Sequence, residues 1–219
     1  MATRKLLCGI GVNDADYKVL DSAQYEKDGK TKTIFFFKCP YHSVWKGIFD
    51  RCYSSYRTTK YPSYEGCSVA PEWTYFSNFR KWMVEQHWEG MQLDKDLLVK
   101  GNKVYGPNTC AFVPSKINII LHTKESCRGD YPVGVTYLKK TGKFMSSINN
   151  TYMGNYATYQ EAHQRWQLEK ARIIRETVIW WSEDSSVNKT LNKSIASNLL
   201  YVADKLDCDR LSGVITEGL

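Results

Sequence analysis

The pattern of hydrophobic and polar positions in the first half of this 219-residue chain predicts one strand and two helices. Residues 31–38 (TKTIFFFK) are rich in β-branched and aromatic side chains, which predicts a strand. Apolar residues recur every fourth position over residues 41–54, which predicts a helix. A second helix is expected to begin at Pro71, because proline at the first helical position sacrifices no hydrogen bond. The polar, turn-rich residues 55–70 are expected to form a loop.

The second half of the chain predicts a small sheet followed by a long helix. Residues 134–148 alternate in polarity around a Lys-Thr-Gly turn, which is typical of a β-hairpin, and residues 151–156 add a third short strand. Thr158 and Glu161 have the spacing of a capping box, so a long helix is expected to begin there. These patterns together predict an α+β fold in which a three-stranded antiparallel sheet packs on a long helix.

The last segment, residues 187–211, is predicted to form an amphipathic helix. Six aliphatic side chains recur in it at helical spacing: Val187, Leu191, Ile195, Leu199, Val202 and Leu206. A stripe of this width is expected to be buried, since each fully buried Leu or Ile contributes roughly 1.5–3 kcal/mol. It would pack either on the long helix or on a second copy of the chain, which would make a homodimer.

Composition narrows the class of partner. The chain has 30 basic and 23 acidic residues, a net charge of +7 that favours a polyanion. No apolar run reaches the ~18–20 residues needed to span a bilayer, so no membrane partner is expected. The N-terminus lacks a secretory pattern, which predicts a cytoplasmic location. Seven cysteines without paired spacing favour reduced thiols over disulfides.

Residues 93–110 (LDKDLLVKGNKVYGPNTC) carry the clearest candidate chemistry. An acidic pair, Asp94 and Asp96, precedes a Gly-Asn turn and a short second strand, and a short helix is expected after Pro114. Carboxylate oxygens suit Mg²⁺, which would stabilise the leaving oxygen of a phosphodiester. Lys95 is a poor general base unless burial lowers its pKa, and would otherwise bind phosphate as a point charge. The alternative is that the acidic pair and Lys95 form a solvated turn.

Residues 41–118 resemble the HNH-type homing endonuclease family of bacteriophages in the order and spacing of several pieces. The pieces are Tyr41…Trp45…Arg51-Cys52-Tyr53, Tyr64…Val69…Glu72-Trp73…Phe76…Phe79, LDKD, GNKVYGPNTC and Asn118. The resemblance implies a ββα hairpin module that binds DNA and, if active, hydrolyses a phosphodiester with Mg²⁺ held by Asp94 and Asp96. Lys95 stands where the family has its histidine base, and Asn118 matches its last asparagine. The alternative is an inactive module that binds DNA or a host protein as a regulator or inhibitor.

Zinc is the other metal that the sequence raises. Cys39 and His42 have the spacing Cys-x-x-His, and Cys52, Cys67 and Cys110 are the remaining thiols nearby in the sequence. Their spacings match no recognised zinc pattern, so these thiols are expected to be buried and structural.

Residues 133–175 resemble the ethylene-response-factor type DNA-binding domain of the plant Apetala family, which also occurs fused to phage HNH nucleases. The matching pieces are Gly134-Val135, Gly142-Lys143-Phe144, Ile148 and YMGNYATYQEA. The resemblance implies that one face of the sheet lies in the DNA major groove while the other packs on the helix. Period-two alternation, which points Phe144, Ser146 and Ile148 at the helix, assigns the groove face to Thr136, Lys139, Lys140, Lys143, Met145, Ser147 and Asn149.

The predicted groove face favours phosphate contacts over strong base recognition. Its lysines would bind phosphates and position the sheet, while its Ser, Thr and Asn side chains would reach base edges. The arginines and tryptophan that the Apetala family places in the groove are mostly missing here, so strong arginine–guanine recognition is not expected. The predicted segments are 1–30 (unassigned), 31–122 (HNH-like module), 123–132 (linker), 133–182 (Apetala-like domain) and 183–219 (C-terminal helix).

Overall fold

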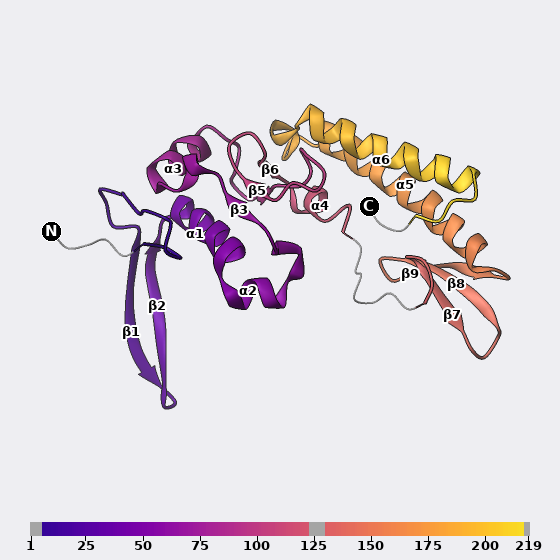
Figure 1. Cartoon of the computed structure of the whole chain (residues 1–219), viewed down its shortest axis with the longest axis horizontal. Helices are drawn as coiled ribbons and strands as arrows, with labels where there is room; N and C mark the ends of the chain where they lie inside the picture. Colours follow the sequence, from indigo (N-terminus) through magenta and orange to yellow (C-terminus); the bar gives the residue numbers. More distant parts are fainter. Residues whose placement is uncertain (1–5, 123–129, 217–219) are drawn as a thin grey trace. The chain divides into compact units, whose positions relative to one another are not determined.

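The computed structural model of this protein describes residues 6–122 and 130–216, and the chain divides into two compact units, residues 1–112 and 113–219 (Figure 1). Helices and several small sheets are mixed along the chain, which confirms the α+β class. Most of the predicted linker, residues 123–129, lies outside the described residues. The unit boundary differs from the predicted segments, because residues 113–122 group with the C-terminal unit and residues 183–219 belong to it as well.

The N-terminal unit begins with a β-hairpin and continues through short helices and strands. Its elements are β1 (Leu20–Lys27), β2 (Lys30–Lys38), α1 (Pro40–Tyr53), α2 (Ser55–Lys60), η1 (Pro62–Tyr64), β3 (Ser68–Val69), η2 (Pro71–Trp73), α3 (Phe76–Val84), β4 (Gln92–Asp94) and β5 (Val104–Tyr105), with β6 (Ala111–Val113) at the unit boundary. The predicted strand at 31–38 is present as β2, and its antiparallel partner β1 comes from the segment with no predicted role.

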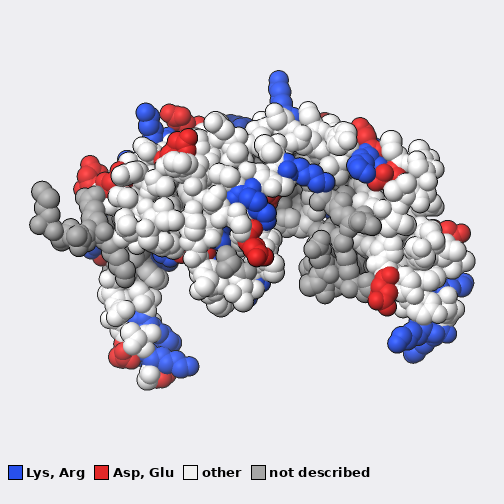
Figure 2. Space-filling view, viewed as in Figure 1, with Lys and Arg blue, Asp and Glu red and all other residues white. Residues whose placement is uncertain are grey.

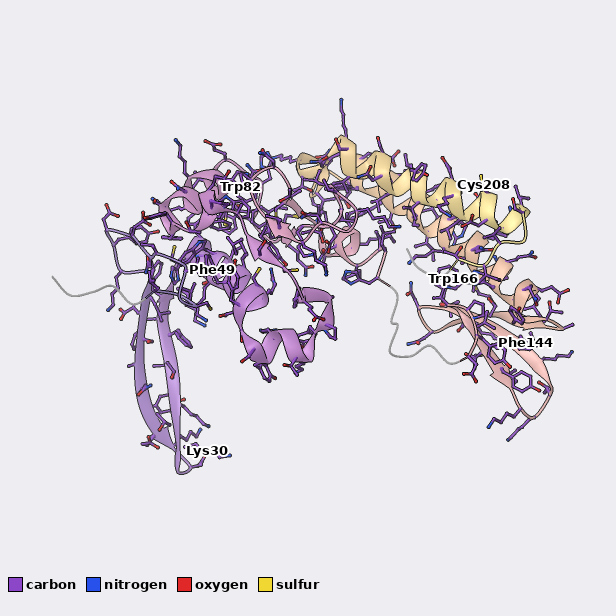
Figure 3. The ribbon with its side chains drawn as sticks, viewed as in Figure 1. Lys30, Phe49, Trp82, Phe144, Trp166 and Cys208 are labelled. Carbon is purple, nitrogen blue, oxygen red and sulfur yellow. The ribbon has the colours of Figure 1, made fainter. Side chains whose placement is uncertain are left out.

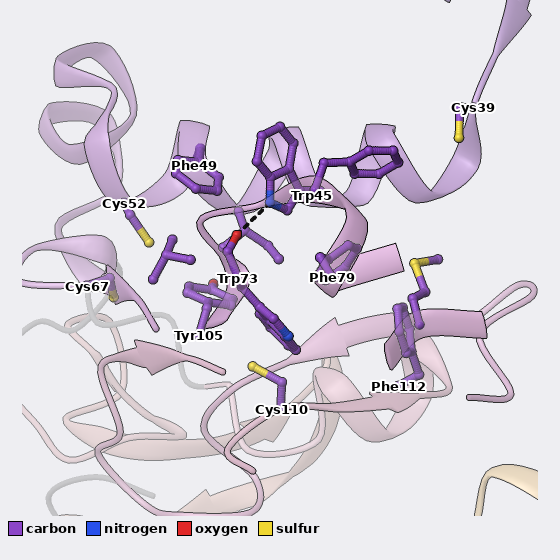
Figure 4. Close-up of a cluster of buried hydrophobic side chains, with 14 residues drawn as sticks. Cys39, Trp45, Phe49, Cys52, Cys67, Trp73, Phe79, Tyr105, Cys110 and Phe112 are labelled. Carbon is purple, nitrogen blue, oxygen red and sulfur yellow. Dashed lines mark hydrogen bonds between the residues drawn. The ribbon is translucent and has the colours of Figure 1, made fainter. Parts of the chain in front are cut away.

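Two predictions for residues 55–85 are corrected. Residues 55–70 contain α2, η1 and β3, so the expected loop is wrong for most of that segment. The helix expected from Pro71 begins as one 3₁₀ turn, and the α-helix starts only at Phe76, after Tyr75 adopts an extended conformation. The break has a packing reason: the Trp45 indole nitrogen donates a 2.7 Å hydrogen bond to the Trp73 carbonyl oxygen, which is therefore turned toward α1 rather than along a helix (Figure 4).

The core of the N-terminal unit is aromatic and lies between α1, α3 and the short strands (Figure 4). Trp45, Phe49 and Phe79 are completely buried, and the Trp45 and Phe49 ring centroids are 4.8 Å apart in a tilted arrangement. Aromatic pairs of this geometry add roughly 0.5–1.5 kcal/mol beyond the burial of their surface. The apolar stripe predicted for residues 41–54 is therefore the face of α1 that forms this core.

The strand pairing around the acidic pair differs from a simple hairpin across residues 93–110. Strand β4 pairs with β6, whereas β5 pairs in parallel with β3, with Ser68 opposite Val104. The two paired strands β4 and β6 are followed directly by α4 (Ser115–Asn118), which is shorter than the helix expected after Pro114. The Gly-Asn turn at residues 101–102 therefore joins strands of two different sheets.

The C-terminal unit confirms the predicted sheet and long helix. Its elements are α4, β7 (Val135–Leu138), β8 (Lys143–Ile148), β9 (Thr151–Tyr156), α5 (Tyr159–Glu183), η4 (Asn188–Thr190) and α6 (Lys193–Leu211). The strands form an antiparallel sheet in the order β7-β8-β9, which packs on α5. Both hydrogen bonds of the predicted capping box are present between Thr158 and Glu161. Gly134 lets the sheet approach the helix, since its φ is +81° and an added Cβ would lie 2.0 Å from the Trp166 ring.

Residues 113–122 join the C-terminal unit through two lysines. The buried Lys170 ammonium of α5 donates to the Ile120 carbonyl oxygen at 2.5 Å. Burial lowers the pKa of Lys170 to about 8. The Lys116 ammonium lies 4.6 Å from the centroid of the Trp180 ring of α5, a favourable cation–π distance. These contacts explain why the helix predicted to close the nuclease-like module groups with α5 instead.

Helix α6 packs along α5 and buries its apolar stripe within the chain. Ile195, Leu199 and Leu206 of the predicted stripe are buried, together with Ala203. The helix begins later than predicted, because the Asn192 side chain accepts hydrogen bonds from the backbone N–H groups of the first turn. The apolar stripe of α6 is therefore covered by α5 of the same chain and not by a second copy of the chain. A homodimer stays a prediction.

The segment after α6 is tied back to α5 through a neutral histidine. The His163 ring is buried: its Nε2 accepts a hydrogen bond from the Thr216 N–H at 3.0 Å, and its Nδ1 lies 3.0 Å from the Val133 carbonyl oxygen. Since Nε2 accepts, the proton is on Nδ1 and the ring is uncharged. Burial lowers the pKa of His163, against opposing contributions from the Val133 carbonyl and Asp209.

We expect this histidine to make the stability of the C-terminal unit depend on pH. The folded pKa is lowered, so its contribution is complete above the unfolded pKa of about 6.5 and is lost as the pH falls toward the folded value, by at most about 1.4 kcal/mol per pH unit. Urea midpoints at pH 7.5 and pH 5.5 measure the loss. His163→Gln should reduce the difference between the two midpoints, whereas the exposed His122→Gln should leave it unchanged. An equal pH dependence in both variants would contradict this assignment.

Candidate nucleic-acid interface

Asp94 ends β4 and its carboxylate organises the loop that follows. One oxygen, Oδ1, accepts hydrogen bonds from the backbone N–H groups of Asp96 and Leu97, each at 2.7 Å. Burial raises the pKa of Asp94, and these two backbone hydrogen bonds oppose that rise without overcoming it. The carboxylate thus acts as the cap of a tight turn, a role that short acidic side chains commonly take.

Lys95 is buried beneath the same loop, although it carries a charge. Its side chain is 6% exposed, and its ammonium donates to Asp96 Oδ1 at 2.5 Å and to the Asn102 carbonyl oxygen at 3.0 Å. The Asp96 carboxylate itself remains half exposed. The prediction of a solvated turn is therefore wrong for Lys95. Both hydrogen-bonding partners of this ammonium lie within the loop, which leaves it little surface for a phosphate or a nucleophilic water.

Asn102 closes the loop from the opposite side. Its Nδ2 donates to the Lys95 and Val104 carbonyl oxygens, both at 2.8 Å, and its Oδ1 accepts from the Val104 N–H at 3.1 Å. The Thr109 hydroxyl donates to the same Val104 carbonyl at 2.7 Å. Sequence reasoning counted Asn102 only as a turn residue and missed its organising role. Its place directly after Gly101 is the signal that marks a turn, but it does not reveal these partners.

The remaining predicted residue of the nuclease-like site, Asn118, lies outside this loop. Within the part of the chain that the structure describes, no three His, Cys, Asp or Glu side chains are grouped so as to hold a metal ion. Asn118 is the last residue of α4, belongs to the C-terminal unit and donates its backbone N–H to the Pro114 carbonyl oxygen at 3.0 Å. Asp94 and Asp96 are thus the two carboxylates that the loop itself brings together.

The cysteines considered for zinc are buried in the core of the N-terminal unit. Cys39, Cys52, Cys67 and Cys110 are all less than 10% exposed. Burial raises the pKa of Cys52 and of Cys110 to about 12, so both thiols stay protonated at neutral pH. The His42 ring packs edge-on against Phe76 at 5.2 Å, and burial lowers its pKa. These environments are those of structural side chains.

The outward face of the three-stranded sheet carries a row of uncharged side chains. The strand register places Thr136, Met145 and Asn155 side by side across the sheet. The neighbouring row, which consists of Tyr137, Phe144 and Tyr156, points to the opposite face, where Phe144 lies toward α5 (Figure 3). Period-two alternation thus assigns Thr136 and Met145 to the outward face, as the sequence predicts.

The lysines predicted for this face lie at one end of the sheet. Lys139 and Lys140 are exposed in the β7–β8 turn, which Gly142 completes with a φ of +66°. Lys143 is exposed at the start of β8, opposite Leu138. Figure 2 shows basic side chains gathered at this end of the sheet.

Two residues near the other end of β8 depart from the regular strand. The register shifts between Ser146 and Ser147, where β9 contains the extra residue Met153, and Ser147 is half-buried. Asn149 lies in the two-residue turn with Asn150, and both have positive φ angles of 49° and 65°. It is therefore a turn residue, because Asn tolerates this conformation better than other side chains with a Cβ. Its prediction as a strand residue facing outward is corrected.

Sequence reasoning missed two outward side chains on β9. Asn155 completes the row with Thr136 and Met145, and Tyr152 is 60% exposed opposite Ser147. The period-two pattern of β9 was the available signal, but Gly154 interrupts it and the extra residue Met153, which has no partner in β8, changes its register. The face therefore offers one more amide and one more aromatic ring than predicted.

The charged side chains of the segment that forms the sheet are all positive. Residues 131–160 contain three lysines and no aspartate or glutamate. The nearest carboxylates in the sequence are Asp130 and Glu161, and Glu161 is held in the capping box. An anionic partner on the outward face would therefore meet lysines and neutral polar groups without a repelling carboxylate from this segment.

Similarity to other proteins does not assign a function to these residues. Among residues 6–122 and 130–216, no helix has the length and apolar character needed to cross a bilayer. Function is therefore inferred from the sheet face and from the loop at residues 94–109. Comparisons with protein-family models, with curated proteins and with solved structures found no match to this chain.

Proposed function

We propose that this protein binds double-stranded DNA through the outward face of the β7–β9 sheet. The observation that carries the proposal is the combination of three exposed lysines with a polar row on a face whose segment has no carboxylate. Strands are known to enter the DNA grooves, and the major groove, about 12 Å wide, admits a β-ribbon. Lys139, Lys140 and Lys143 would bind phosphates, while Thr136 and Asn155 would reach base edges.

The side chains on this face favour affinity over sequence discrimination. A lysine binds phosphate as a point charge, whereas bidentate recognition of guanine is chiefly the role of arginine. The described outward row offers Thr136, Met145 and Asn155, of which Asn155 suits adenine. Binding is therefore expected to be strongly salt-dependent, with a modest preference among sequences.

We propose further that the loop at residues 94–109 is a structural element, and that the protein binds DNA without efficient cleavage. Support comes from Asp94 Oδ1, which is occupied by two backbone N–H groups, and from the burial of Lys95. Hydrolysis with Mg²⁺ held by Asp94 and Asp96 is the alternative that the HNH resemblance implies. It would need these carboxylates to bind metal through their remaining oxygens and a general base that Lys95, held by its own hydrogen bonds, does not supply.

Replacing the three sheet lysines should weaken DNA binding and reduce its salt dependence. For Lys139→Ala/Lys140→Ala/Lys143→Ala, we expect the slope of log affinity against log salt to fall by about 0.9 for each phosphate that is no longer bound by a lysine. If each of the three lysines binds one phosphate, the decrease in affinity at 50 mM salt should exceed that at 200 mM by about 40-fold. Fluorescence anisotropy with a labelled duplex measures both quantities.

A charge-matched control distinguishes loss of contacts made by the sheet from an effect of net charge alone. Lys100, Lys189 and Lys193 are exposed lysines outside the sheet, and their triple alanine variant loses the same charge. It should change the slope by less than one unit. Equal effects of the two triple variants would remove the sheet from the interface. No DNA binding by the wild type at any salt concentration would leave a host-protein partner as the alternative.

A further inference from the structure

The β1–β2 hairpin is an exposed two-stranded sheet. Every residue of its two strands is exposed except Asp21, which is half-buried. The turn uses Asp28 and Gly29, whose φ angles of 54° and 67° match the twist that two-residue hairpins favour. An isolated two-stranded hairpin is marginally stable in water, so these surfaces are suited to a partner.

The strand register sorts the side chains of the hairpin onto two different faces. Lys27 lies opposite Lys30, Tyr25 opposite Lys32, and Ala23 opposite Ile34, so these alternate pairs share one face. We name these six residues the lysine face. The pairs between them carry Glu26, Gln24 and Ser22 of β1 on the other face, where Glu26 accepts a 2.6 Å hydrogen bond from the Thr31 hydroxyl.

The lysine face combines positive charge with exposed rings and methyl groups. It holds three lysines and no carboxylate, and the nearest acidic side chain on the turn is Asp28. Tyr25 is 47% exposed and Ile34 is 48% exposed. Figure 2 shows the basic side chains gathered toward the tip of the hairpin, where Figure 3 places Lys30. Such a surface is complementary to a polyanion that also presents apolar edges.

We propose that the lysine face is a second contact with duplex DNA, made by laying the hairpin as a β-ribbon along the major groove. This inference rests on the proposed function and extends it to the N-terminal unit. The major groove, about 12 Å wide, admits a two-stranded ribbon, and an eight-residue strand reaches about 26 Å along it. Lys27, Lys30 and Lys32 contact phosphates, while Tyr25 and Ile34 meet base edges and thymine methyl groups.

Charge disfavours a second copy of the chain as the occupant. Strand β2 carries Lys30, Lys32 and Lys38 and no carboxylate. Pairing of two β2 edges about a two-fold axis would bring these lysines of both copies together, and like charges on facing strands are destabilising. The Lys38 ammonium already lies 3.6 Å from the centroid of the Phe35 ring, where it covers part of the apolar surface.

A variant that exchanges the faces without changing composition tests the proposal. Lys30→Thr/Thr31→Lys/Lys32→Thr/Thr33→Lys in the full chain keeps the net charge and moves two lysines to the face that bears Glu26. We expect the salt slope for duplex binding to fall by about 1.8, so that the decrease in affinity at 50 mM salt exceeds that at 200 mM by about tenfold. Unchanged circular dichroism and thermal midpoint would show that the fold is retained.

The outcomes separate this inference from the proposed function. Weakened binding by the face-exchanged variant, additive with the sheet triple variant, supports both contacts. Wild-type affinity and slope in the face-exchanged variant, with weakened binding in the sheet variant, would overturn the hairpin contact and leave the sheet in place. A dimer that the exchange converts to a monomer in sedimentation would identify a second copy as the occupant and also overturn it. A wild type that binds no DNA overturns both proposals.

Discussion

Leu199→Asp is expected to unfold the C-terminal unit. Leu199 is fully buried on α6, which packs along α5. Shortening a buried leucine costs roughly 2–5 kcal/mol, and an aspartate adds the penalty of an unpaired charge in apolar surroundings. Because domains are stable by only about 5–15 kcal/mol, this single change should remove most of the stability of the unit. Thermal melting followed by circular dichroism measures it.

The neighbouring residue supplies a matched control. Leu200 is 38% exposed, so Leu200→Asp makes the same chemical change at the surface of the same helix. It should destabilise the unit much less than Leu199→Asp does, because more than a third of the Leu200 surface already faces solvent. Sedimentation of both variants tests the alternative, since a Leu199→Asp protein that stays folded but loses a dimer would mean that the stripe packs between two chains. That outcome would contradict the packing of α6 on α5.

Lys95→Met is expected to destabilise the N-terminal unit by about 2 kcal/mol without altering DNA cleavage. Methionine keeps most of the buried volume but removes the hydrogen bonds to Asp96 and Asn102. Hydrogen bonds of a charged group contribute roughly 1.5–3 kcal/mol, and the Asn102 carbonyl loses a partner. Urea denaturation measures the change, with the exposed Lys100→Met in the same loop as its control.

A plasmid-nicking assay decides whether the loop is also a catalytic site. Wild type, Lys95→Met and Asp94→Ala are compared with Mg²⁺ or Mn²⁺ and with EDTA. If the loop is only a structural element, none of the three proteins should nick the plasmid above the EDTA background. Three results together would show that the loop is a nuclease site and that its assignment as a structural element is wrong. The wild type would nick the plasmid, Asp94→Ala would abolish this activity, and Lys95→Met would lose it at unchanged stability.

Local patterns predicted most of the regular elements. Helix α1, the β7–β9 sheet and α5 follow from helical spacing, from alternation and from the capping box at Thr158, whereas the exposed strand β2 follows from its β-branched and aromatic composition. Strand β1 was not predicted, because its sequence LDSAQYEK is polar on both faces and has no pattern that burial could impose. Helix α2 was not predicted for a similar reason: SYRTTK is short, and its described side chains, those other than Thr58, are exposed.

Strand pairing around the acidic pair depends on long-range contacts. The Gly-Asn turn favours a local hairpin, yet Val104 pairs with Ser68 and β4 pairs with β6. The aromatic core decides this, because it buries both Tyr105 of β5 and Phe112 of β6. Local turn chemistry contributes less than burial of two aromatic side chains, so it does not select the partner of β4.

By itself the sequence determined the α+β class, the helix-backed sheet and the lysine end of that sheet. These depend on residue identity and on spacing within a few turns or strands. Only the tertiary structure decided that Lys95 is buried, that Asn149 is a turn residue, and that α6 packs on α5. Burial of Lys95 and packing of α6 depend on which distant groups cover a side chain, whereas the conformation of Asn149 depends on where β8 ends and β9 begins. The spacing of residues along the sequence does not predict such contacts.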